Sequence, residues 1–297
     1  MRGIVVALGN FDGVHLGHKA VIQRAVEEGR KRGLRVVVAT FDPHPQAVLR
    51  PGSKLELLTT MEVRKEMLLA CGVDEVRAIR FDENLSKKNP EEFVREVLIG
   101  EFKAVVVVVG ENFRFGYKAS GSVEDLRRYM QQMGGEGYTV PTYAFLGESI
   151  NSTKIRTLIA SGEVREAARL LGRPYSLRGK VVIGDKRGHA IGFPTANVLP
   201  YPCSLVPGRG VYVSHVWVEA ECYGACTNVG VAPTFDQRGS RVEAHLLGYQ
   251  GDLYGNVVDV TFIERLRPEK RFSGVDELKE QIAQDIVEAR KILGEDA

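Results

Sequence analysis

Two histidines in a glycine-bearing segment are the residues whose spacing first suggests chemistry. His15 and His18 stand three positions apart, so one helical turn would direct both imidazoles to the same side. Two imidazole donors at one point suit a phosphate on which negative charge builds while one oxygen replaces another. A lone histidine more often caps a turn or lies in a core. Because two of the six histidines fall within this short run, a phosphate site is the favoured interpretation.

The same segment follows an expected strand and precedes an expected helix. In an open α/β sheet this first strand-to-helix turn lies at the carboxyl edge, where ligands bind and a helix amino terminus offers N–H groups to an anion. Gly9, Gly13 and Gly17 would let the backbone approach that anion closely. The segment therefore predicts a phosphate site built from backbone and imidazole donors.

Polar side chains at two later points of the first half fit the same site. Asn112 follows an expected strand, where its amide would bond a nucleotide or flavin edge, although a plain turn is an equally good interpretation. Ser152 and Thr153 begin an expected helix, where they either cap it or bond phosphate oxygens. Arg156, one turn later, would provide a forked donor for a triphosphate.

The second half carries a different set of groups. Thr195 and Asn197 belong to a Gly-Phe-Pro-Thr-Ala-Asn run that begins at Gly192 and follows a glycine-bearing loop starting at Gly184. Such a loop can wrap phosphates with backbone amides, although a proline-initiated turn is the simpler interpretation of the run. The spacing of a Walker loop is absent from the sequence.

Glu243 stands in an alternating segment that predicts a strand. It shares one face of that strand with Arg241 and His245. From the residues alone, solvent exposure is the usual interpretation of such a carboxylate, and a role as a proton acceptor is the alternative.

The elements that must position these groups differ between the two halves. The first half alternates β-branched runs with helical patterns, which indicates parallel strands joined by crossover helices. Strands are expected at residues 4–8, 34–41, 76–80, 104–110 and 138–144, with apolar helical patterns at residues 21–26 and 90–99. The predicted fold class of this half is an open α/β sheet.

Beyond residue 172 the pattern changes. Residues 211–263 alternate with period two between turn residues, as strands of an antiparallel sheet do, and closure into a small barrel would remove exposed edges. A final helix is expected, with one apolar stripe formed by Val275, Leu278, Ile282 and Ile286. Because the helical pattern breaks at residues 172–175, we predict domains at residues 1–172 and 173–297.

Composition argues against several classes of function. The 40 basic and 38 acidic residues leave a net charge of +2, so no general basic field exists to hold nucleic acid or an anionic membrane. The longest apolar run, residues 104–109, is too short to cross a bilayer, and the amino terminus enters a strand pattern without a signal core. Four scattered cysteines suggest neither a disulfide framework nor a zinc site. We therefore expect a cytoplasmic protein with reduced thiols.

The run from Gly9 to His18 resembles the HxGH nucleotidyltransferase signature, and its flanks resemble the bacterial bifunctional riboflavin kinase/FAD synthetase family. Matching segments lie at residues 40–45, 110–116, 150–156, 192–197, 207–212, 228–235, 241–247, 252–255 and 266–269. The resemblance therefore extends over nearly the entire chain.

For residues 1–172 the resemblance implies an FMN adenylyltransferase with a Rossmann-like α/β fold built on an open parallel sheet. Its expected catalytic residues are His15, His18 and Arg156. Nucleotide and phosphate groups are expected to bind at Gly9, Asn10, Phe11, Gly13, Gly17, Asn112, Ser152 and Thr153. Phe41 and His44 are expected to contact the flavin, although a rigid loop role for His44 between two prolines is equally good. The implied reaction is attack of the FMN phosphate on the α-phosphorus of ATP, which gives FAD and pyrophosphate.

For residues 173–297 the resemblance implies a riboflavin kinase on a six-stranded antiparallel β-barrel with a C-terminal helix. Thr195 and Asn197 are expected to hold Mg²⁺ beside the ATP phosphates, with Gly184 and Gly192 in the phosphate-binding loop. Glu243 is expected to accept the proton of the riboflavin 5′-hydroxyl as it attacks the γ-phosphorus, which yields FMN and ADP. Arg267 and Phe272 are expected to close over the flavin. ATP is the expected co-substrate at both sites, and the chain is expected to be a monomer or a weak homo-oligomer.

Two alternatives stay open at this point. A nucleotidyltransferase could use another acceptor, such as a phosphopantetheine, nicotinamide or glycerol phosphate, but such an enzyme has no need of the second half. A non-catalytic flavin-binding module is the other alternative, against which the intact candidate residues argue. Two departures from the family pattern fall in the kinase half: His189 replaces a common Arg, and Gly248 replaces a common Asp.

Overall fold

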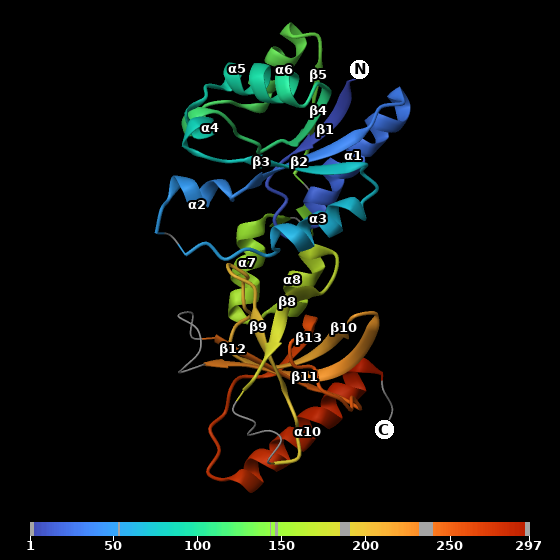
Figure 1. Ribbon diagram of the computed structural model, residues 1–297, viewed down its shortest axis with the longest axis vertical. Helices are drawn as coiled ribbons and strands as arrows, with labels where there is room; N and C mark the ends of the chain where they lie inside the picture. Colours follow the sequence, from blue (N-terminus) through green and yellow to red (C-terminus); the bar gives the residue numbers. More distant parts are fainter. Residues whose placement is uncertain are drawn as a thin grey trace. The chain divides into compact units, whose positions relative to one another are not determined.

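The computed structural model describes residues 3–52, 54–142, 144–145, 148–184, 191–231 and 240–294. The chain forms two compact units, of which the first ends at Ser152 and the second begins at Thr153. Each unit contains a sheet of its own (Figure 1).

The first unit is built on a five-stranded parallel sheet with the order β3-β2-β1-β4-β5. Its strands are β1 (Ile4–Leu8), β2 (Val36–Asp42), β3 (Glu75–Arg80), β4 (Ala104–Gly110) and β5 (Glu136–Val140). Its helical segments are α1 (Leu16–Arg32), α2 (Pro45–Leu49), α3 (Met61–Leu69), α4 (Glu83–Lys87), α5 (Pro90–Glu92), the wider-turned η1 (Phe93–Glu101), η2 (Tyr117–Ala119) and α6 (Val123–Gln132). A short ladder joins β6 (Ala144–Phe145) to β7 (Glu148–Ser149). The predicted open parallel α/β sheet is confirmed.

Both faces of the sheet are buried at the central strands β2, β1 and β4, as their continuous apolar sequences require. Alternate residues of β1 belong to different clusters: Val6 and Leu8 pack with residues of η1 and α6, whereas Val5 and Ala7 pack with residues of α1 and α3. Figure 1 shows α1 and α6 separated by the sheet. This burial fixes the carboxyl end of β1, where the histidine segment begins.

Two predicted strands have different bounds in the structure. Gly33 ends α1 with a φ of 62°, and the amide of Leu34 donates to the carbonyl of Gly29 at 3.0 Å. Residue 34 therefore closes the helix, and β2 begins at Val36 rather than at residue 34. The strand predicted at residues 138–144 occupies Glu136–Val140 instead, because Pro141, which has no amide hydrogen, follows immediately.

The second unit contains a closed antiparallel barrel with the order β10-β11-β12-β9-β8-β13. Its strands are β8 (Tyr175–Val182), β9 (Ala196–Pro200), β10 (Gly210–Val218), β11 (Glu221–Val231), β12 (Ser240–Leu246) and β13 (Val257–Arg267). The helices that the structure describes in this part of the chain are α7 (Ser152–Ser161), α8 (Val164–Leu171) and α10 (Val275–Leu293). The predicted six-stranded barrel with a C-terminal helix is confirmed.

The terminal helix packs on the barrel through only part of its predicted stripe. Ile286 and Ala289 pack with Val213 and Cys226 of the barrel. Val275, in contrast, is 54% exposed, so the expected stripe is wrong at its amino-terminal end. The carboxyl-terminal half of α10 is therefore the part that anchors it to the barrel.

The structure divides the chain after Ser152, whereas the sequence predicts a domain boundary after residue 172. The helices α7 and α8 lie between these two positions. Most of α7 and all of α8 belong to the second unit, where α8 contacts β8 and β13. Arg165 on α8 pairs with Glu264 on β13 at 3.2 Å. The boundary predicted between residues 172 and 173 stays a prediction about the extent of each catalytic domain.

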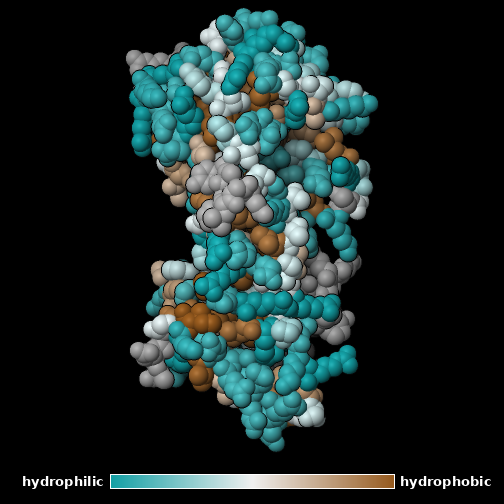
Figure 2. Space-filling view, turned by 180° about the vertical axis from the view of Figure 1, so that it is seen from behind, coloured by the Kyte–Doolittle hydropathy of each residue, from teal (hydrophilic) through white to brown (hydrophobic). Residues whose placement is uncertain are grey.

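Figure 2 shows a mainly hydrophilic face on which the hydrophobic areas are limited in extent. Among the helices of the described ranges, none combines the length and the apolar content needed to cross a bilayer.

Candidate functional sites

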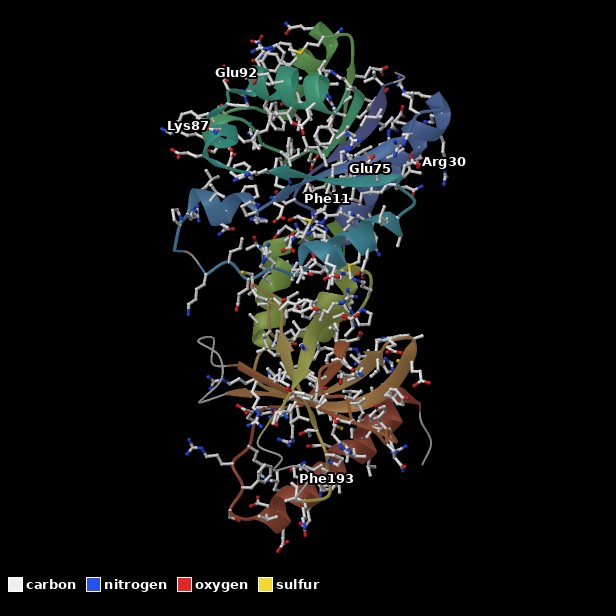
Figure 3. The ribbon with its side chains drawn as sticks, viewed as in Figure 1. Phe11, Arg30, Glu75, Lys87, Glu92 and Phe193 are labelled. Atoms are coloured by element: carbon white, nitrogen blue, oxygen red, sulfur yellow. The ribbon has the colours of Figure 1, made fainter. Side chains whose placement is uncertain are left out.

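The loop between β1 and α1 carries the histidine pair at the carboxyl edge of the parallel sheet, where Figure 3 shows Phe11. His15 is the N-cap of α1, and its Nδ1 accepts a hydrogen bond from the backbone N–H of His18 at 3.2 Å. Because Nδ1 accepts, a neutral His15 carries its hydrogen on Nε2 and can donate from that atom.

The structure brings the two imidazoles together, as their spacing indicated. The ring centroids of His15 and His18 lie 3.5 Å apart with an angle of 18° between the ring planes. The ring of Phe11 contacts that of His18 edge-on at 5.3 Å. His15 is only 4% exposed, whereas His18 is partly exposed. The pair therefore forms one stacked unit that is open to solvent on the His18 side.

The backbone of this loop adopts conformations that are rare for most residues. The φ angles of Phe11, Gly13 and Val14 are 49°, 83° and 41°. A Cβ atom on Gly13 would lie 2.6 Å from Cδ1 of Leu58. Gly13 is thus required for its φ and for the close approach of a neighbouring side chain, not only for the approach of an anion.

The other two glycines of the loop differ from Gly13. A Cβ atom on Gly9 would meet the ring of Phe11 at 3.2 Å. Gly17 lies in the first turn of α1. Asn10, between these positions, uses its carbonyl to accept from the hydroxyl of Thr40 at 2.9 Å. Contacts within the protein therefore fix the loop residues that are expected to bind phosphate, and the same residues lie near the histidines.

A buried ion pair beneath the loop was missed in the sequence. Asp12 and Arg64 are each 1% exposed, and Nη2 of Arg64 lies 3.0 Å from Oδ1 of Asp12. The carboxylate also accepts from the amides of Leu58 and Thr59, each at 3.0 Å. Arg64 donates in addition to the carbonyls of Asn10 and Thr59, at 3.1 and 3.0 Å. Two loops that are distant in sequence are thereby tied together directly before His15.

The start of α7 also reaches this loop. The hydroxyl of Ser152 donates to the carbonyl of Asp12 at 3.0 Å. Thr153 is exposed, and Arg156 lies one turn further along the same helix and is partly buried. Ser152 is therefore a structural partner of the histidine loop, whatever it contributes to nucleotide binding.

The remaining predicted residues of the first half occupy the ends of neighbouring strands. Asn112, after β4, is exposed and donates from Nδ2 to the hydroxyl of Thr142 at 2.7 Å. His44 caps α2, because its Nδ1 accepts a backbone N–H at 3.2 Å. Phe41 is only 7% exposed and packs edge-on against Phe81 at 5.7 Å. Phe41 thus belongs to the core, where its contribution to a flavin pocket is to its wall.

Two cavities on the barrel unit share one lining residue, Thr195. The larger, of about 390 Å³, is lined by residues that include Gly184, Thr195, Asn197 and Tyr254. The smaller, of about 310 Å³, is lined by residues that include Phe193, Thr195, Glu243, Arg267 and Phe272. The structure therefore divides the predicted kinase residues into two sets that meet at Thr195.

Strand pairing places two of the predicted residues opposite each other. In the antiparallel pairing of β12 with β9, Glu243 is the partner of Asn197. Arg241 joins them: its Nη2 lies 2.7 Å from Oε1 of Glu243, and its Nε and Nη2 donate to Oδ1 of Asn197 at 3.2 and 3.1 Å. The sequence placed Arg241 on this strand face but did not indicate its contact with Asn197.

His245 connects the Phe-Pro-Thr segment to the same strand face. Its Nδ1 lies 2.7 Å from the carbonyl oxygen of Pro194, so Nδ1–H is the donor. The ring of Phe193 contacts the imidazole edge-on at 5.8 Å. Figure 3 shows Phe193 beside α10, whose Leu278 and Ile282 line the smaller cavity together with Phe193.

A second forked ion pair forms one wall of the smaller cavity. Nε and Nη2 of Arg267 donate to Oδ1 and Oδ2 of Asp285 on α10 at 2.9 and 2.7 Å. The guanidinium carbon of Arg267 also lies 5.9 Å from the ring centroid of Phe272. The thiol of Cys226 lines the same wall, and its burial, followed by the charge of Asp285, raises the pKa of this thiol to about 12. Asp285 was not singled out in the sequence.

The glycines predicted for the phosphate loop have unequal surroundings. A Cβ atom on Gly184 would lie 2.1 Å from Nδ2 of Asn197, so a larger residue would displace that amide from its present position. Gly192 has a φ of 90°, and a Cβ atom there would meet no neighbour within 4 Å. Gly248 lies after β12 with a φ of 74° and is exposed. His189 and the other loop positions from 185 to 190 lie outside the described residues.

The donor set of the barrel fits Mg²⁺ in company with phosphate. Within the ranges that the structure describes, no three His, Cys, Asp or Glu side chains are gathered to hold a metal by themselves. Thr195 and Asn197 offer single neutral oxygens, which Mg²⁺ accepts when phosphate oxygens and water complete its shell. The amide oxygen of Asn197 has two lone pairs, so its contact with Arg241 does not preclude a metal on its other side.

Comparisons with known proteins divide the chain in a similar way. The FAD synthetase family matches residues 1–154, and the riboflavin kinase family matches residues 171–293. The chain is 37% identical to the bifunctional riboflavin kinase/FMN adenylyltransferase of Escherichia coli (strain K12), covering 99% of this chain and 94% of that one. The protein so named from Bacillus subtilis is 36% identical, covering 96% of this chain and 91% of that one.

A solved structure has the same fold over nearly its full length. This crystal structure, described as a macrolide-efflux protein from Streptococcus pneumoniae, superposes with a TM-score of 0.89 at 33% identity. The match covers 97% of this chain and 94% of the other.

Proposed function

The chain belongs to the family of bifunctional riboflavin kinase/FMN adenylyltransferases, and on this premise we propose which residues carry each of its two reactions. It is an enzyme that phosphorylates riboflavin to FMN and adenylylates FMN to FAD, with ATP as the donor. A nucleotidyltransferase with another acceptor and a non-catalytic module are thereby excluded. We assign adenylylation to residues 1–172 and phosphorylation to residues 173–297.

Adenylylation takes place at the loop between β1 and α1. A phosphate oxygen of FMN attacks the α-phosphorus of ATP, and the bond to pyrophosphate breaks. Negative charge builds on the oxygens of the α-phosphate, where His15 and His18 donate hydrogen bonds together with backbone amides at the α1 amino terminus. The stacked geometry of the two rings, with Nδ1 of His15 engaged by the His18 amide, supports donation by His15 from Nε2.

The remaining residues of the first site hold the substrates. Backbone groups of Gly9, Asn10, Phe11, Gly13 and Gly17 surround the phosphates, while Asn112, Ser152, Thr153 and Arg156 contact the nucleotide. Phe41 and His44 shape the flavin side, and the burial of Phe41 limits its role to packing. No covalent intermediate is needed, because positioning and charge neutralisation suffice for this transfer.

Phosphorylation takes place where the two barrel cavities meet. The riboflavin 5′-hydroxyl attacks the γ-phosphorus of ATP, Glu243 accepts the hydroxyl proton, and ADP leaves. ATP occupies the larger cavity, with Gly184 and Gly192 at its phosphates, and riboflavin occupies the smaller cavity with Arg267 and Phe272. Mg²⁺ held by Thr195 and Asn197 would neutralise charge on the ATP phosphates.

The sharing of Thr195 by the two cavities carries this assignment. A phosphoryl group passes directly between donor and acceptor, so their sites must adjoin at the residues that bind the phosphate. Glu243 and Asn197 are paired across β12 and β9 at that junction. The expected cytoplasmic location and the expected monomer or weak homo-oligomer stay predictions.

Separation of the flavins formed by single-residue variants tests the proposal. Purified protein is incubated with ATP and Mg²⁺ and with either riboflavin or FMN. Glu243→Ala should abolish FMN formation from riboflavin while FAD formation from FMN continues, and His18→Ala should have the opposite effect. Equal loss of both activities in either variant would contradict the assignment of separate sites.

A further inference from the structure

We propose that Arg241 is a positioning residue of the riboflavin kinase site, which fixes the amide oxygen of Asn197, the proposed metal ligand, and holds the carboxylate of Glu243 beside it. The inference rests on the proposed functions of Asn197 and Glu243. Arg241 itself is neither the proposed metal ligand nor the proposed proton acceptor.

One guanidinium reaches both functional groups. Nε and Nη2 of Arg241 lie 3.2 and 3.1 Å from Oδ1 of Asn197, and Nη2 lies 2.7 Å from Oε1 of Glu243. The side chains of Arg241 and Glu243 are 23% and 22% exposed, so the contact is shielded from much of the solvent. A partly buried forked contact of this kind is stronger than an ion pair between freely hydrated side chains.

The chemistry of arginine explains why this contact orients the amide. A guanidinium has donors and no acceptor, so it admits the oxygen of Asn197 and rejects the NH₂ group. On the other side, Gly184 approaches so closely that a Cβ atom there would lie 2.1 Å from Nδ2 and 2.5 Å from Oδ1. The amide is therefore confined between Gly184 and Arg241 with its oxygen toward Arg241.

The same contact sets the place of the oxygen relative to the reacting groups. Asn197 and Glu243 are register partners, and Arg241 lines the smaller cavity while Asn197 lines the larger one. Arg241 therefore holds the metal-binding oxygen at the junction of the cavities and beside the proton acceptor. Loss of a residue that orients a metal ligand typically lowers metal affinity or activity about 10- to 100-fold.

Lysine would not replace arginine here. An ammonium group retains the charge, but it cannot present two fixed donors to one oxygen while a third contact holds a carboxylate. The comparison of Arg241→Lys with Arg241→Gln therefore separates the geometry of the fork from its charge.

Binding of Mn²⁺ tests the proposal without relying on turnover. Mn²⁺ is titrated into the full chain in the presence of ADP, and free Mn²⁺ is measured by electron paramagnetic resonance. The class of sites that Asn197→Ala removes defines the kinase metal site. Arg178→Gln is the matched control, because Arg178 makes a similar forked pair with Asp259 at 2.9 Å and lines neither cavity.

We expect Arg241→Gln and Arg241→Lys to weaken Mn²⁺ binding in that class about 10- to 100-fold. The Mg²⁺ concentration for half-maximal riboflavin phosphorylation should rise in parallel. FAD formation from FMN should stay unchanged in both variants, because that reaction is assigned to residues 1–172, and Arg178→Gln should bind Mn²⁺ like the unaltered chain.

Three results would overturn the inference. If Asn197→Ala removes a class of sites that both Arg241 variants retain at full affinity, Arg241 does not position the metal ligand. If Arg241→Lys matches the unaltered chain while Arg241→Gln is impaired, charge alone is responsible and the fork is irrelevant. If Asn197→Ala removes no class of sites, the proposed metal site itself is wrong, and the inference fails with it.

Discussion

Asp12 and Arg64 form an ion pair of 3.0 Å in which both residues are 1% exposed. The pair lies at the junction of the histidine loop with the segment that leads into α3. The carboxylate also accepts hydrogen bonds from Leu58 and Thr59, so the loop before His15 depends on a segment far along the chain. The position of the first site is thus set by tertiary contacts beneath it.

Removal of one partner of this pair should destabilise the first unit. Arg64→Met leaves the Asp12 carboxylate buried without its cation, which typically costs about 3–5 kcal/mol. FAD formation from FMN should fall, whereas riboflavin phosphorylation, which takes place in the other unit, should continue. Urea unfolding and separation of the flavins measure the two effects.

The exposed pair between Arg35 and Glu75 provides the control for that change. Nη2 of Arg35 lies 3.1 Å from Oε2 of Glu75, and the two side chains are 61% and 33% exposed. Arg35→Met should therefore lower the free energy of unfolding by no more than about 1 kcal/mol. Comparable losses from Arg35→Met and Arg64→Met would mean that burial of the Asp12 pair is unimportant.

Gly13→Ala should impair adenylylation more than its backbone angle alone implies. The left-handed conformation at a φ of 83° costs alanine about 1–2 kcal/mol, and the new Cβ would lie 2.6 Å from Cδ1 of Leu58. Gly33→Ala is the matched control, because Gly33 has a φ of 62° but no atom within 4 Å of a Cβ. Thermal unfolding and FAD formation should be affected more by the first change, and equal effects would refute the importance of the Leu58 contact.

Asp285→Asn should weaken riboflavin binding through Arg267. The change removes the charge that holds the Arg267 guanidinium at the wall of the smaller cavity, so the KM for riboflavin should rise about 10-fold. FAD formation from supplied FMN should be unaffected. Asp259→Asn breaks a comparable forked pair outside both cavities, and a rise in its riboflavin KM would indicate general loosening of the barrel instead.

Stability of the barrel unit should decline at alkaline pH because of Cys226. Burial raises the pKa of this thiol from 9.0 to about 12, so the unfolded chain ionises first. The stability that the neutral thiol contributes is fully present below pH 9 and is lost as the pH rises through the folded pKa of about 12. In that range the free energy of unfolding should fall with a slope approaching about 1.4 kcal/mol per pH unit. Urea unfolding under reducing conditions between pH 8.5 and about 11 measures it.

Cys226→Ala isolates that contribution. The alanine variant retains Tyr212, whose pKa burial also raises to about 12, so the difference between the two proteins reports on the thiol alone. If the free energy of unfolding depends on pH in the same way in both proteins, Cys226 does not cause the alkaline loss of stability.

Local spacing was sufficient to predict the parts of the molecule that backbone geometry sets over a few residues. His15 and His18 meet because residues three apart share one side of a helical turn, and the residues of β1 alternate between two buried clusters because strand side chains alternate. The parallel sheet and a small antiparallel barrel followed from such patterns, whereas the six strands of the barrel and the family were implied by the resemblance of the motifs. Predicted strand ends were less accurate, since Gly33 and Pro141 decide them through caps and missing donors.

Contacts between distant segments were decided only by packing and strand register. Nothing in the spacing of Asp12 and Arg64, or of Arg267 and Asp285, indicates that they meet, because each contact depends on how a helix docks against another element. Likewise, Arg241 reaches Asn197 only because β9 pairs with β12 in the register that sets Asn197 opposite Glu243. A shift of one residue in that pairing would turn each side chain to the other face of the barrel and leave the kinase residues apart.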